Sequence, residues 1–329
     1  MSKLKFEVNP GLLMPASDRF SGEGYKDPIA LDDAIRIAGD LKDADGFGFW
    51  GPGQVLKENA AEMAKITRSY GKEPGTIVVN NWHKDFGWGG LANKRPEMRE
   101  RAVQEACDMM DVAETMGIDI VTMWNAHDGV DYAFQADYFK AWDWMVEGMQ
   151  KIAAYKPNVR LGIEYKVREP RIHQFVANLG DAFTLMNDIG EPNVGITLDL
   201  GHAINAGERI AYSTARCLQK GKLFAMHFGD NYRLWDDDVV IGSVNTIEFI
   251  EVIYWLKKHG WDGWCSLDQY PFKCSAIDAM TESIRWVRGM EKLVDKIGIS
   301  TFDRMIESDE PKLMLKTLRE AMFDMKDED

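Results

Sequence analysis

Acidic and imidazole side chains stand at the ends of four short apolar segments in this sequence. Glu164 follows RLGI, Asp199 follows NVGITL, His227 follows KLFAM and Asp268 follows GWCSL, and His202 comes three residues after Asp199. If the four segments are neighbouring parallel strands, their carboxyl ends bring these side chains to one edge of a sheet. Carboxylates packed this closely require a compensating charge, which a divalent cation supplies. Oxygen ligands with a minority of imidazoles favour manganese or magnesium.

A run of three aspartates, Asp236 to Asp238, lies within the phrase HFGDNYRLWDDDVVIGS of residues 227–243. Taken alone, such a run is typical of a solvated loop, and a strand-end glutamate is typical of a solvated side chain. An Asp-x-x-His pair is typical of a helix cap beside a core histidine. Here the candidates follow successive apolar segments, so their joint placement favours a metal site over these separate structural roles.

Short apolar segments alternate with segments of helical period along the chain. The predicted strands are rich in β-branched and aromatic residues and cover 4–9, 46–50, 76–81, 118–124, 160–165, 193–199, 222–228 and 263–268. The predicted helices cover 31–42, 54–70, 95–116, 135–155, 171–189, 205–219, 246–259 and 275–296. Eight near-continuous apolar strands, each followed by a helix, predict an α/β fold of the (β/α)8 TIM-barrel class. The alternative is an open doubly wound sheet, which the lack of a GxGxxG motif after the first strand disfavours.

The barrel accounts for most of the chain of 329 residues, because this fold commonly takes about 250 residues. We predict a barrel domain over residues 1–297 and a C-terminal helical extension over 298–329. The extension is expected to pack on a neighbouring subunit or on the outside of the barrel. The long connection 80–98, NNWHKDFGWGGLANKRPEM, is rich in aromatic residues and glycine, which indicates an active-site loop.

The charge balance limits the classes of partner. The formal net charge is −14, whereas nucleic acid and anionic membrane surfaces require a basic patch, so neither is an expected partner. The four cysteines show no CxxC spacing and are predicted to be reduced thiols. The start MSKLKFEVNP is not a secretory signal and no apolar run is long enough to span a bilayer, so we expect a cytoplasmic protein.

Several of these motifs together resemble a known family. The set Glu164-x-Lys166, Asp199-x-x-His202, His227, Asp236-x-Asp238 and Asp268 is similar to the xylose isomerase-like barrel superfamily, and most closely to its rhamnose isomerase branch. The order and approximate spacing agree from about residue 75 to residue 290.

The resemblance implies two metal positions. A first ion would be held by Glu164, Asp199, His227 and Asp268. A second, catalytic ion would be held by His202, Asp236 and Asp238, with Asp199 bridging. Asp237 would then point away from the ions and make a supporting contact.

The resemblance also implies a reaction, the conversion of an aldose to a ketose by a metal-mediated 1,2-hydride shift. The cofactor would be Mn²⁺, or Mg²⁺ or Co²⁺, with one or two ions per subunit. Lys166 would donate a hydrogen bond to the oxygen at C1, and Asp268 would move protons. His202 would be the third catalytic residue, because it would be a ligand of the second, catalytic ion. The expected substrate is an unphosphorylated monosaccharide, because the rim is acidic and the later loops lack a glycine-rich phosphate cradle. Relatives of this kind imply a homodimer or homotetramer.

Aromatic and basic residues are predicted to line the sugar pocket. The predicted substrate-binding residues are Trp82, His83, Trp124, His127 and Arg233. In the rhamnose isomerase pattern a loop histidine assists ring opening, but the matching position here is Asn93, so His83 or His127 would be its substitute. Arg233 follows His227 by six residues, as does a hydroxyl-binding arginine in ketose 3-epimerases.

Other functions on this scaffold remain open. A ketose 3-epimerase would use two acids on opposite faces of C3, for which Asp268 is shorter than the usual glutamate. A metal-dependent enzyme that cleaves C-glycosides would share the scaffold. An abasic-site endonuclease of this fold would require a basic groove and more histidine ligands than six histidines allow. A non-catalytic sugar-binding protein would not require so complete a ligand set together with Lys166.

Overall fold

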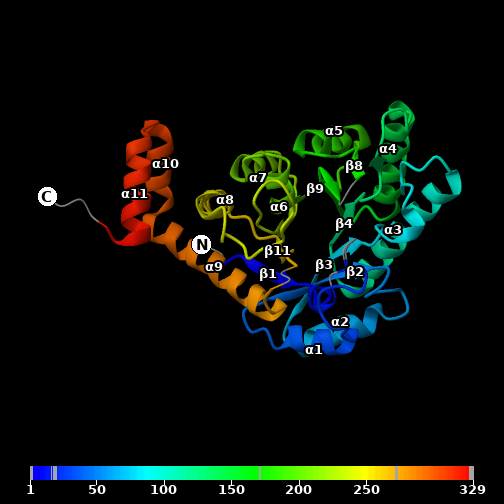
Figure 1. Ribbon diagram of the computed structural model, residues 1–329, viewed down its shortest axis with the longest axis horizontal. Helices are drawn as coiled ribbons and strands as arrows, with labels where there is room; N and C mark the ends of the chain where they lie inside the picture. Colours follow the sequence, from blue (N-terminus) through cyan, green and yellow to red (C-terminus); the bar gives the residue numbers. More distant parts are fainter. Residues whose placement is uncertain (1–2, 16, 18–20, 170–171, 271–272, 326–329) are drawn as a thin grey trace.

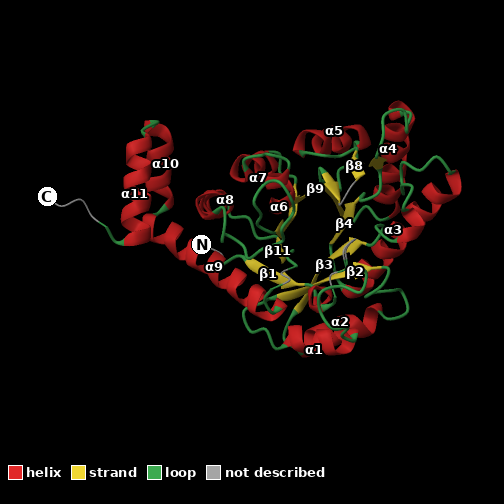
Figure 2. Cartoon of the chain, viewed as in Figure 1, coloured by secondary structure: helices red, strands yellow, loops and turns green. Residues whose placement is uncertain are grey.

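Eight parallel strands close into a barrel in the computed structural model of this protein, which describes residues 3–15, 17, 21–169, 172–270 and 273–325. The strand order around the barrel is β1-β11-β10-β9-β6-β4-β3-β2, and helices surround the ring of strands (Figures 1 and 2). The strands are β1 Lys5–Val8, β2 Gly46–Gly51, β3 Glu73–Val79, β4 Ile120–Trp124, β6 Arg160–Glu164, β9 Val194–Asp199, β10 Leu223–Phe228 and β11 Trp264–Leu267. All eight predicted strands and the (β/α)8 class are confirmed, and the open doubly wound alternative is wrong.

The helices begin and end close to the predicted bounds in most cases. They are α1 Leu31–Gly39, α2 Ala60–Ser69, α3 Pro96–Met116, α4 Tyr138–Tyr155, α5 Leu179–Ile189, α6 Leu200–Asn205, α7 Ile210–Gln219, α8 Thr246–Lys258, α9 Ala276–Ile297, α10 Ile299–Ser308 and α11 Pro311–Phe323, with short 3-10 turns η1 Pro10–Leu13 and η2 Lys84–Phe86. Gly117 ends α3 and Gly190 ends α5, with φ values of 78° and 73°. Glycine adopts this left-handed backbone at the least steric cost because it has no Cβ, which favours the end of each helix at this position.

The helix predicted over 171–189 is too long. The N-cap of α5 is Asn178, whose side chain accepts a hydrogen bond from the Asp181 amide. Before this cap, Ile172–Gln174 forms strand β8, which pairs antiparallel with β5 (Gly129–Val130) and β7 (Arg168–Glu169) in a small separate sheet. Residue 171 lies outside the described residues. An asparagine cap followed by an apolar run was the local signal that marks the true start.

Three other helical segments have different bounds from those predicted. The segment predicted over 205–219 is helical from Ile210, as α7, because a separate short helix α6 ends at Asn205 and Gly207 turns the chain with a φ of 76°. The segment predicted from residue 54 becomes helical at Ala60, after a turn in which Asn59 Oδ1 accepts a hydrogen bond from the Leu56 amide. The C-terminal extension contains two helices, α10 and α11, separated at Asp309, and both lie beside α9 away from the barrel (Figure 1).

Apolar side chains fill the space between the strands and the surrounding helices, while part of the barrel interior is polar. Glu7 of β1 accepts hydrogen bonds from the Thr76 and Ser266 hydroxyls on neighbouring strands. Thr122 Oγ1 and Thr197 Oγ1 lie 2.7 Å apart across the same interior. All four cysteines are free thiols, as predicted, and Cys274 is the exposed one. Among the described helices, none is long and apolar enough to cross a membrane.

Candidate metal centre

One ligand atom each from Glu164, Asp199, His227 and Asp268 lies within 4.8 Å of the other three. The residues stand at the carboxyl ends of β6, β9 and β10 and directly after β11, which are neighbours in the barrel. His227 Nδ1 lies 3.2 Å from Glu164 Oε1, 3.7 Å from Asp268 Oδ2 and 3.9 Å from Asp199 Oδ2. The strand-end rule therefore brings the four predicted side chains together as expected.

Mutual attraction holds this cluster together against the cost of burial. Burial raises the pKa of Asp199 to about 7, and the charges of Asp268 and Glu164 add to the effect while His202 opposes it. Burial lowers the pKa of His227, but the attraction of Glu164 outweighs burial and raises that pKa to about 10. Burial alone would raise the pKa of Glu164, whereas His227 lowers it below its ordinary value. The raised pKa values of Asp199 and Asp268 thus show that it is unfavourable to bury several carboxylates together, and a positive neighbour relieves this cost.

His202 and Asp236 meet as a second group beside the first, and Asp238 lines the same cavity. Among the described residues, only Glu164, Asp199, His227 and Asp268 lie close enough together to hold an ion, so the three predicted ligands of a second ion are not yet gathered around one point. His202 Nε2 lies 3.4 Å from Asp236 Oδ2, and His202 Nδ1 lies 2.9 Å from the Tyr165 carbonyl oxygen and 3.3 Å from Glu164 Oε1. Asp199 caps α6, because its Oδ1 accepts a hydrogen bond of 2.7 Å from the His202 amide. The helix-cap role weighed for Asp199 is therefore present, and it orients the histidine toward the second group.

Lys166 joins this second group as its cation. Its Nζ lies 2.8 Å from Asp236 Oδ2 and 5.1 Å from the centre of the Trp124 ring. Burial raises the pKa of Asp236, but Lys166 and His202 outweigh burial and hold that pKa well below its usual range. Burial and the charges of Asp236 and Asp268 raise the pKa of Asp238 well above its ordinary value. The lowered pKa of Asp236 makes it the ionised member of the pair, whereas the raised pKa of Asp238 disfavours its ionisation.

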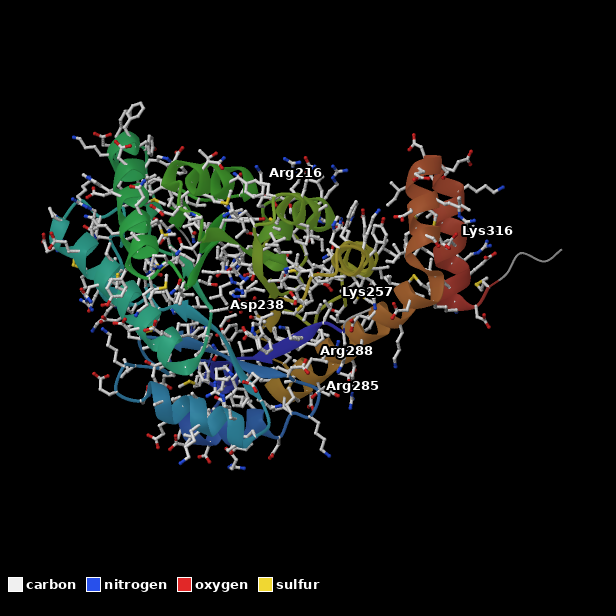
Figure 3. All side chains as sticks on the ribbon, turned by 180° about the vertical axis from the view of Figure 1, so that it is seen from behind. Arg216, Asp238, Lys257, Arg285, Arg288 and Lys316 are labelled. Carbon is white, nitrogen blue, oxygen red and sulfur yellow. The ribbon has the colours of Figure 1, made fainter. Side chains whose placement is uncertain are left out.

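The aspartate loop after β10 has a defined backbone. Asp230 and Val239 pair across the loop in an isolated antiparallel bridge, with 3.0 Å from the Val239 amide to the Asp230 carbonyl oxygen. Asp237 Oδ2 accepts a hydrogen bond of 2.9 Å from the Tyr232 amide and so ties the loop to itself. Asp238 adopts a φ of 48°. Figure 3 places the labelled Asp238 in the central region that the helices enclose, far from Lys316 of α11.

Side chains of both groups line one cavity of about 480 Å³, and Asp199 is the predicted ligand that does not reach its wall. Its lining includes seven predicted residues of the centre, namely Glu164, Lys166, His202, His227, Asp236, Asp238 and Asp268. Trp82 and Trp124 are also on the wall, with ring centres 5.6 Å apart, and Trp50 stacks on Tyr270 at 6.1 Å. The volume falls in the range of small-molecule sites, roughly 300–1,000 Å³.

Three predicted substrate-binding residues do not lie on the described wall of this cavity. His83 faces Glu105, with 3.4 Å between Nε2 and Oε2. His127 Nε2 lies 2.8 Å from the Trp82 carbonyl oxygen, so this side chain supports the loop behind the wall. Arg233 turns outward through a φ of 74° and forms an ion pair with Glu248. Asn93 is buried within the loop, where its Nδ2 donates a hydrogen bond to the Gly89 carbonyl oxygen.

Four residues on the cavity wall, Glu7, Asn9, Trp50 and Tyr270, were not predicted from the sequence. Glu7 is buried on the wall of the same cavity, and burial raises its pKa while the Ser266 and Thr76 hydroxyls oppose the rise. Its Oε2 has no hydrogen-bond partner among the described residues. An acid between Phe6 and Val8 was the available signal, because a core-facing carboxylate is rare. Asn9, Trp50 and Tyr270 carried no comparable signal.

The donor set fits a hard divalent cation. It offers carboxylates with a minority of imidazoles and no thiolate, which suits manganese or magnesium. Glu164, Asp199 and His227 are buried, whereas Asp268 keeps about a third of its side chain exposed. A centre with three enclosed ligands and one ligand open to a cavity suits a cation that also meets a substrate.

Comparison with known proteins gives consistent results. The family model described as a xylose isomerase-like TIM barrel matches residues 36–290. The xylose isomerase of Thermus caldophilus is 24% identical over 216 residues, which is 64% of this chain and 53% of that protein, so the match spans about half the length of this relative. The structure of L-ribulose 3-epimerase superposes with a TM-score of 0.70 at 13% identity, over 89% of this chain and 96% of that chain. A xylose isomerase domain protein from Alicyclobacillus acidocaldarius gives a TM-score of 0.65 at 16% identity, over 89% and 100% of the two chains, and both structural likenesses concern the fold alone.

Proposed function

Because the chain belongs to the xylose isomerase-like TIM barrel family, we propose that it is a divalent-metal-dependent sugar isomerase or epimerase. Within this class we favour an aldose–ketose isomerase that acts on an unphosphorylated monosaccharide by a 1,2-hydride shift. One observation carries the choice, namely that Lys166 lies on the wall of one cavity together with every predicted metal ligand except Asp199. A purely structural ion would not require an ammonium group and an open cavity beside it.

The proposal assigns two sets of ligands. Glu164, Asp199, His227 and Asp268 would hold a first ion, and His202, Asp236 and Asp238 a second ion, with Mn²⁺, Mg²⁺ or Co²⁺ as the candidates. A divalent ion bound there would act as a Lewis acid toward the oxygens of an open-chain sugar.

The chain's own side chains would supply the remaining chemistry. Lys166 would donate a hydrogen bond from Nζ to the sugar oxygen on which negative charge develops, and the Trp124 ring limits the directions that Nζ can take. Asp268, the most open carboxyl of the cluster, would accept and return a proton at its carboxylate oxygens. Trp82 and Trp124 would cover the apolar face of the sugar and exclude water from it.

A ketose 3-epimerase is the second candidate, and one observation favours it. Glu164 and Asp268 face the same cavity from β6 and β11, with β9 and β10 between them in the barrel. Two carboxyls that approach a bound carbon from different sides could remove a proton and return it to the opposite face. A hydride shift requires no such pair of carboxyls. The homodimer or homotetramer stays part of the proposal as the expected assembly.

Metal-dependent turnover tests the proposal. Protein stripped with a chelator would be reloaded with Mn²⁺, Mg²⁺ or Co²⁺ and incubated with a panel of unphosphorylated aldoses and ketoses, with products separated by chromatography. We expect turnover that depends on added metal and is lost in Glu164→Gln. Glu100→Gln, on the surface of α3, is the matched control and should behave as wild type. Absence of turnover on the whole panel by metal-loaded protein would contradict the proposal.

A further inference from the structure

Asn231 makes an unusual set of contacts at the start of the aspartate loop. It is fully buried. Its Nδ2 donates hydrogen bonds to the Gly201 carbonyl oxygen at 2.8 Å and to Asp236 Oδ1 at 3.2 Å. Its Oδ1 accepts a hydrogen bond of 2.9 Å from the Arg233 amide. One neutral side chain thus links α6, the loop backbone and a predicted metal ligand.

These contacts divide the two oxygens of Asp236 between different neighbours. Oδ1 faces the Asn231 amide, while Oδ2 faces Lys166 Nζ at 2.8 Å and His202 Nε2 at 3.4 Å. Rotation of a carboxylate about its last side-chain bond is soft, so its orientation depends on such contacts. A donor on Oδ1 therefore keeps Oδ2 directed toward the cavity.

Gly201 brings the loop and α6 close enough for this arrangement. A Cβ at position 201 would lie 3.0 Å from Asp236 Oδ1, 3.2 Å from Asp199 Oδ1 and 3.4 Å from Asn231 Nδ2. A larger residue would separate the carboxylate of the loop from the helix that carries His202. The glycine and the asparagine thus act together, one by leaving room and the other by bonding across it.

Asn231 is separate from the residue that folds the loop. Asp230 accepts hydrogen bonds from the Val244 amide at 2.9 Å, the Asn245 amide at 3.1 Å and Asn245 Nδ2 at 2.6 Å. These bonds close the loop at its base without touching Asp236. The side chain of Asn231 adds the link to the ligand itself.

We propose that Asn231 is a positioning residue that holds Asp236 in the orientation required for the second ion. This inference rests on the proposed function, since it assumes that Asp236 is a ligand of a second ion. Loss of a supporting contact to a metal ligand typically costs about 10–100-fold in metal affinity. The structure therefore predicts selective weakening of one ion and no change in the other.

The test is Mn²⁺ binding to full-length, metal-stripped protein, measured by calorimetry and by electron paramagnetic resonance of the bound ion. Wild type is expected to bind two ions. In Asn231→Ala the second ion should bind about 10–100-fold more weakly while the first is unchanged. Asn205→Ala is the matched control, because Asn205 Nδ2 bonds the Arg233 carbonyl oxygen of the same loop at 3.2 Å but does not reach Asp236. Both ions should bind it as in wild type.

Asn231→Asp gives a second readout and keeps the size of the side chain if the alanine variant does not fold. It replaces the donor to Asp236 with a carboxylate, so the second ion should again be the one weakened. If the Asn231 variants bind the second ion as tightly as wild type does, the inference is overturned and the proposed function stands. Wild type that binds fewer than two ions would contradict the two-ion part of the proposed function and the inference with it.

Discussion

Lys166 Nζ lies 2.8 Å from Asp236 Oδ2, and this ion pair joins the end of β6 to the aspartate loop on the wall of the cavity. Both side chains are buried, so salt screens their attraction only weakly. The pair sets a predicted hydrogen-bond donor directly beside a predicted ligand. Replacement of either partner tests a different part of the account, because one is assigned to the substrate and the other to an ion.

Lys166→Met should lower turnover far more than it lowers metal content. The ammonium donor to the substrate oxygen is removed, and loss of one such donor typically costs about 10²–10³ in kcat. Metal content by atomic emission and kcat on the best substrate would be measured on the same samples. Lys57→Met, on a surface ion pair with Asp108, is the control and should leave both values unchanged. An unchanged kcat in Lys166→Met would remove the role assigned to this residue.

Asp236→Asn should weaken the second ion and abolish most activity with little effect on folding. The change keeps the size of the side chain but removes the charge that faces His202 and Lys166. The loss of affinity should exceed the ~10–100-fold typical of a lost supporting contact. Asp237→Asn provides the comparison, because Asp237 bonds the Tyr232 amide instead of the centre. Full activity in Asp236→Asn would contradict the two-ion proposal.

Gly75→Ala should destabilise the barrel because of Glu7. A Cβ at position 75 would lie 1.7 Å from Glu7 Oε2, so the carboxyl or the strand must move, at a cost of about 1–3 kcal/mol or more. Urea unfolding of Gly75→Ala, Glu7→Ala and the double variant would measure the coupling, and the double variant should lose less than the sum of the single changes.

Gly289→Ala serves as the control for the glycine change. A Cβ there meets nothing within 4 Å, and the residue lies inside α9, so the change should stabilise the fold by up to about 1 kcal/mol. The prediction for Gly75→Ala is contradicted if the double variant loses as much free energy of unfolding as Gly75→Ala and Glu7→Ala lose in sum, because the two positions then do not compete for space.

Asp128 should make stability depend on pH. Its carboxylate accepts hydrogen bonds from the Gly90, Leu91 and Ala92 amides, yet burial outweighs them and raises its pKa from 3.8 to about 6. Because the folded state binds this proton more tightly than the unfolded chain, the contribution to stability is full at low pH and is lost as pH rises through 6. The shift of about two units corresponds to about 3 kcal/mol.

The free energy of unfolding of wild type and Asp128→Asn would be compared between pH 4 and pH 7 in the presence of a chelator. Relative to Asp128→Asn, wild type should lose about 2 kcal/mol of stability between pH 4 and pH 7, because part of the total is already lost at pH 4, just above the unfolded pKa of 3.8. The other titrating groups are common to both proteins and cancel in the difference. A difference that stays constant over this range would contradict the raised pKa of Asp128.

Sequence periodicity was sufficient for the barrel and for the four-residue cluster. Short apolar runs mark the strands, and a closed parallel barrel brings their carboxyl ends to one rim, so Glu164, Asp199, His227 and Asp268 are expected there from the sequence pattern. Their grouping as the ligands of one ion came from the family resemblance. The path of a loop does not follow from spacing. Arg233 has a positive φ, and its side chain forms an ion pair with Glu248 instead of entering the cavity. No sequence pattern indicates this conformation.

Contacts between segments that lie far apart in the sequence could not be predicted either. His127 bonds the Trp82 carbonyl oxygen, and its histidine character alone suggested a substrate role. Asn231 meets Gly201 and Asp236 only because α6 and the aspartate loop pack together in the folded barrel. Glu7 reaches the cavity because Gly48 and Gly75 leave room for it, and this depends on the register of β1, β2 and β3.

The most direct test of the central claim is the fate of the substrate hydrogens. Manganese-loaded protein would be incubated with free aldoses and ketoses in heavy water, and the products read by proton NMR. The account predicts conversion of an aldose to a ketose without uptake of deuterium at C1 or C2, because a hydride shift moves the hydrogen directly between the two carbons. Deuterium at C3 of a ketose, with no exchange between aldose and ketose, would contradict the isomerase and leave the epimerase as the better account.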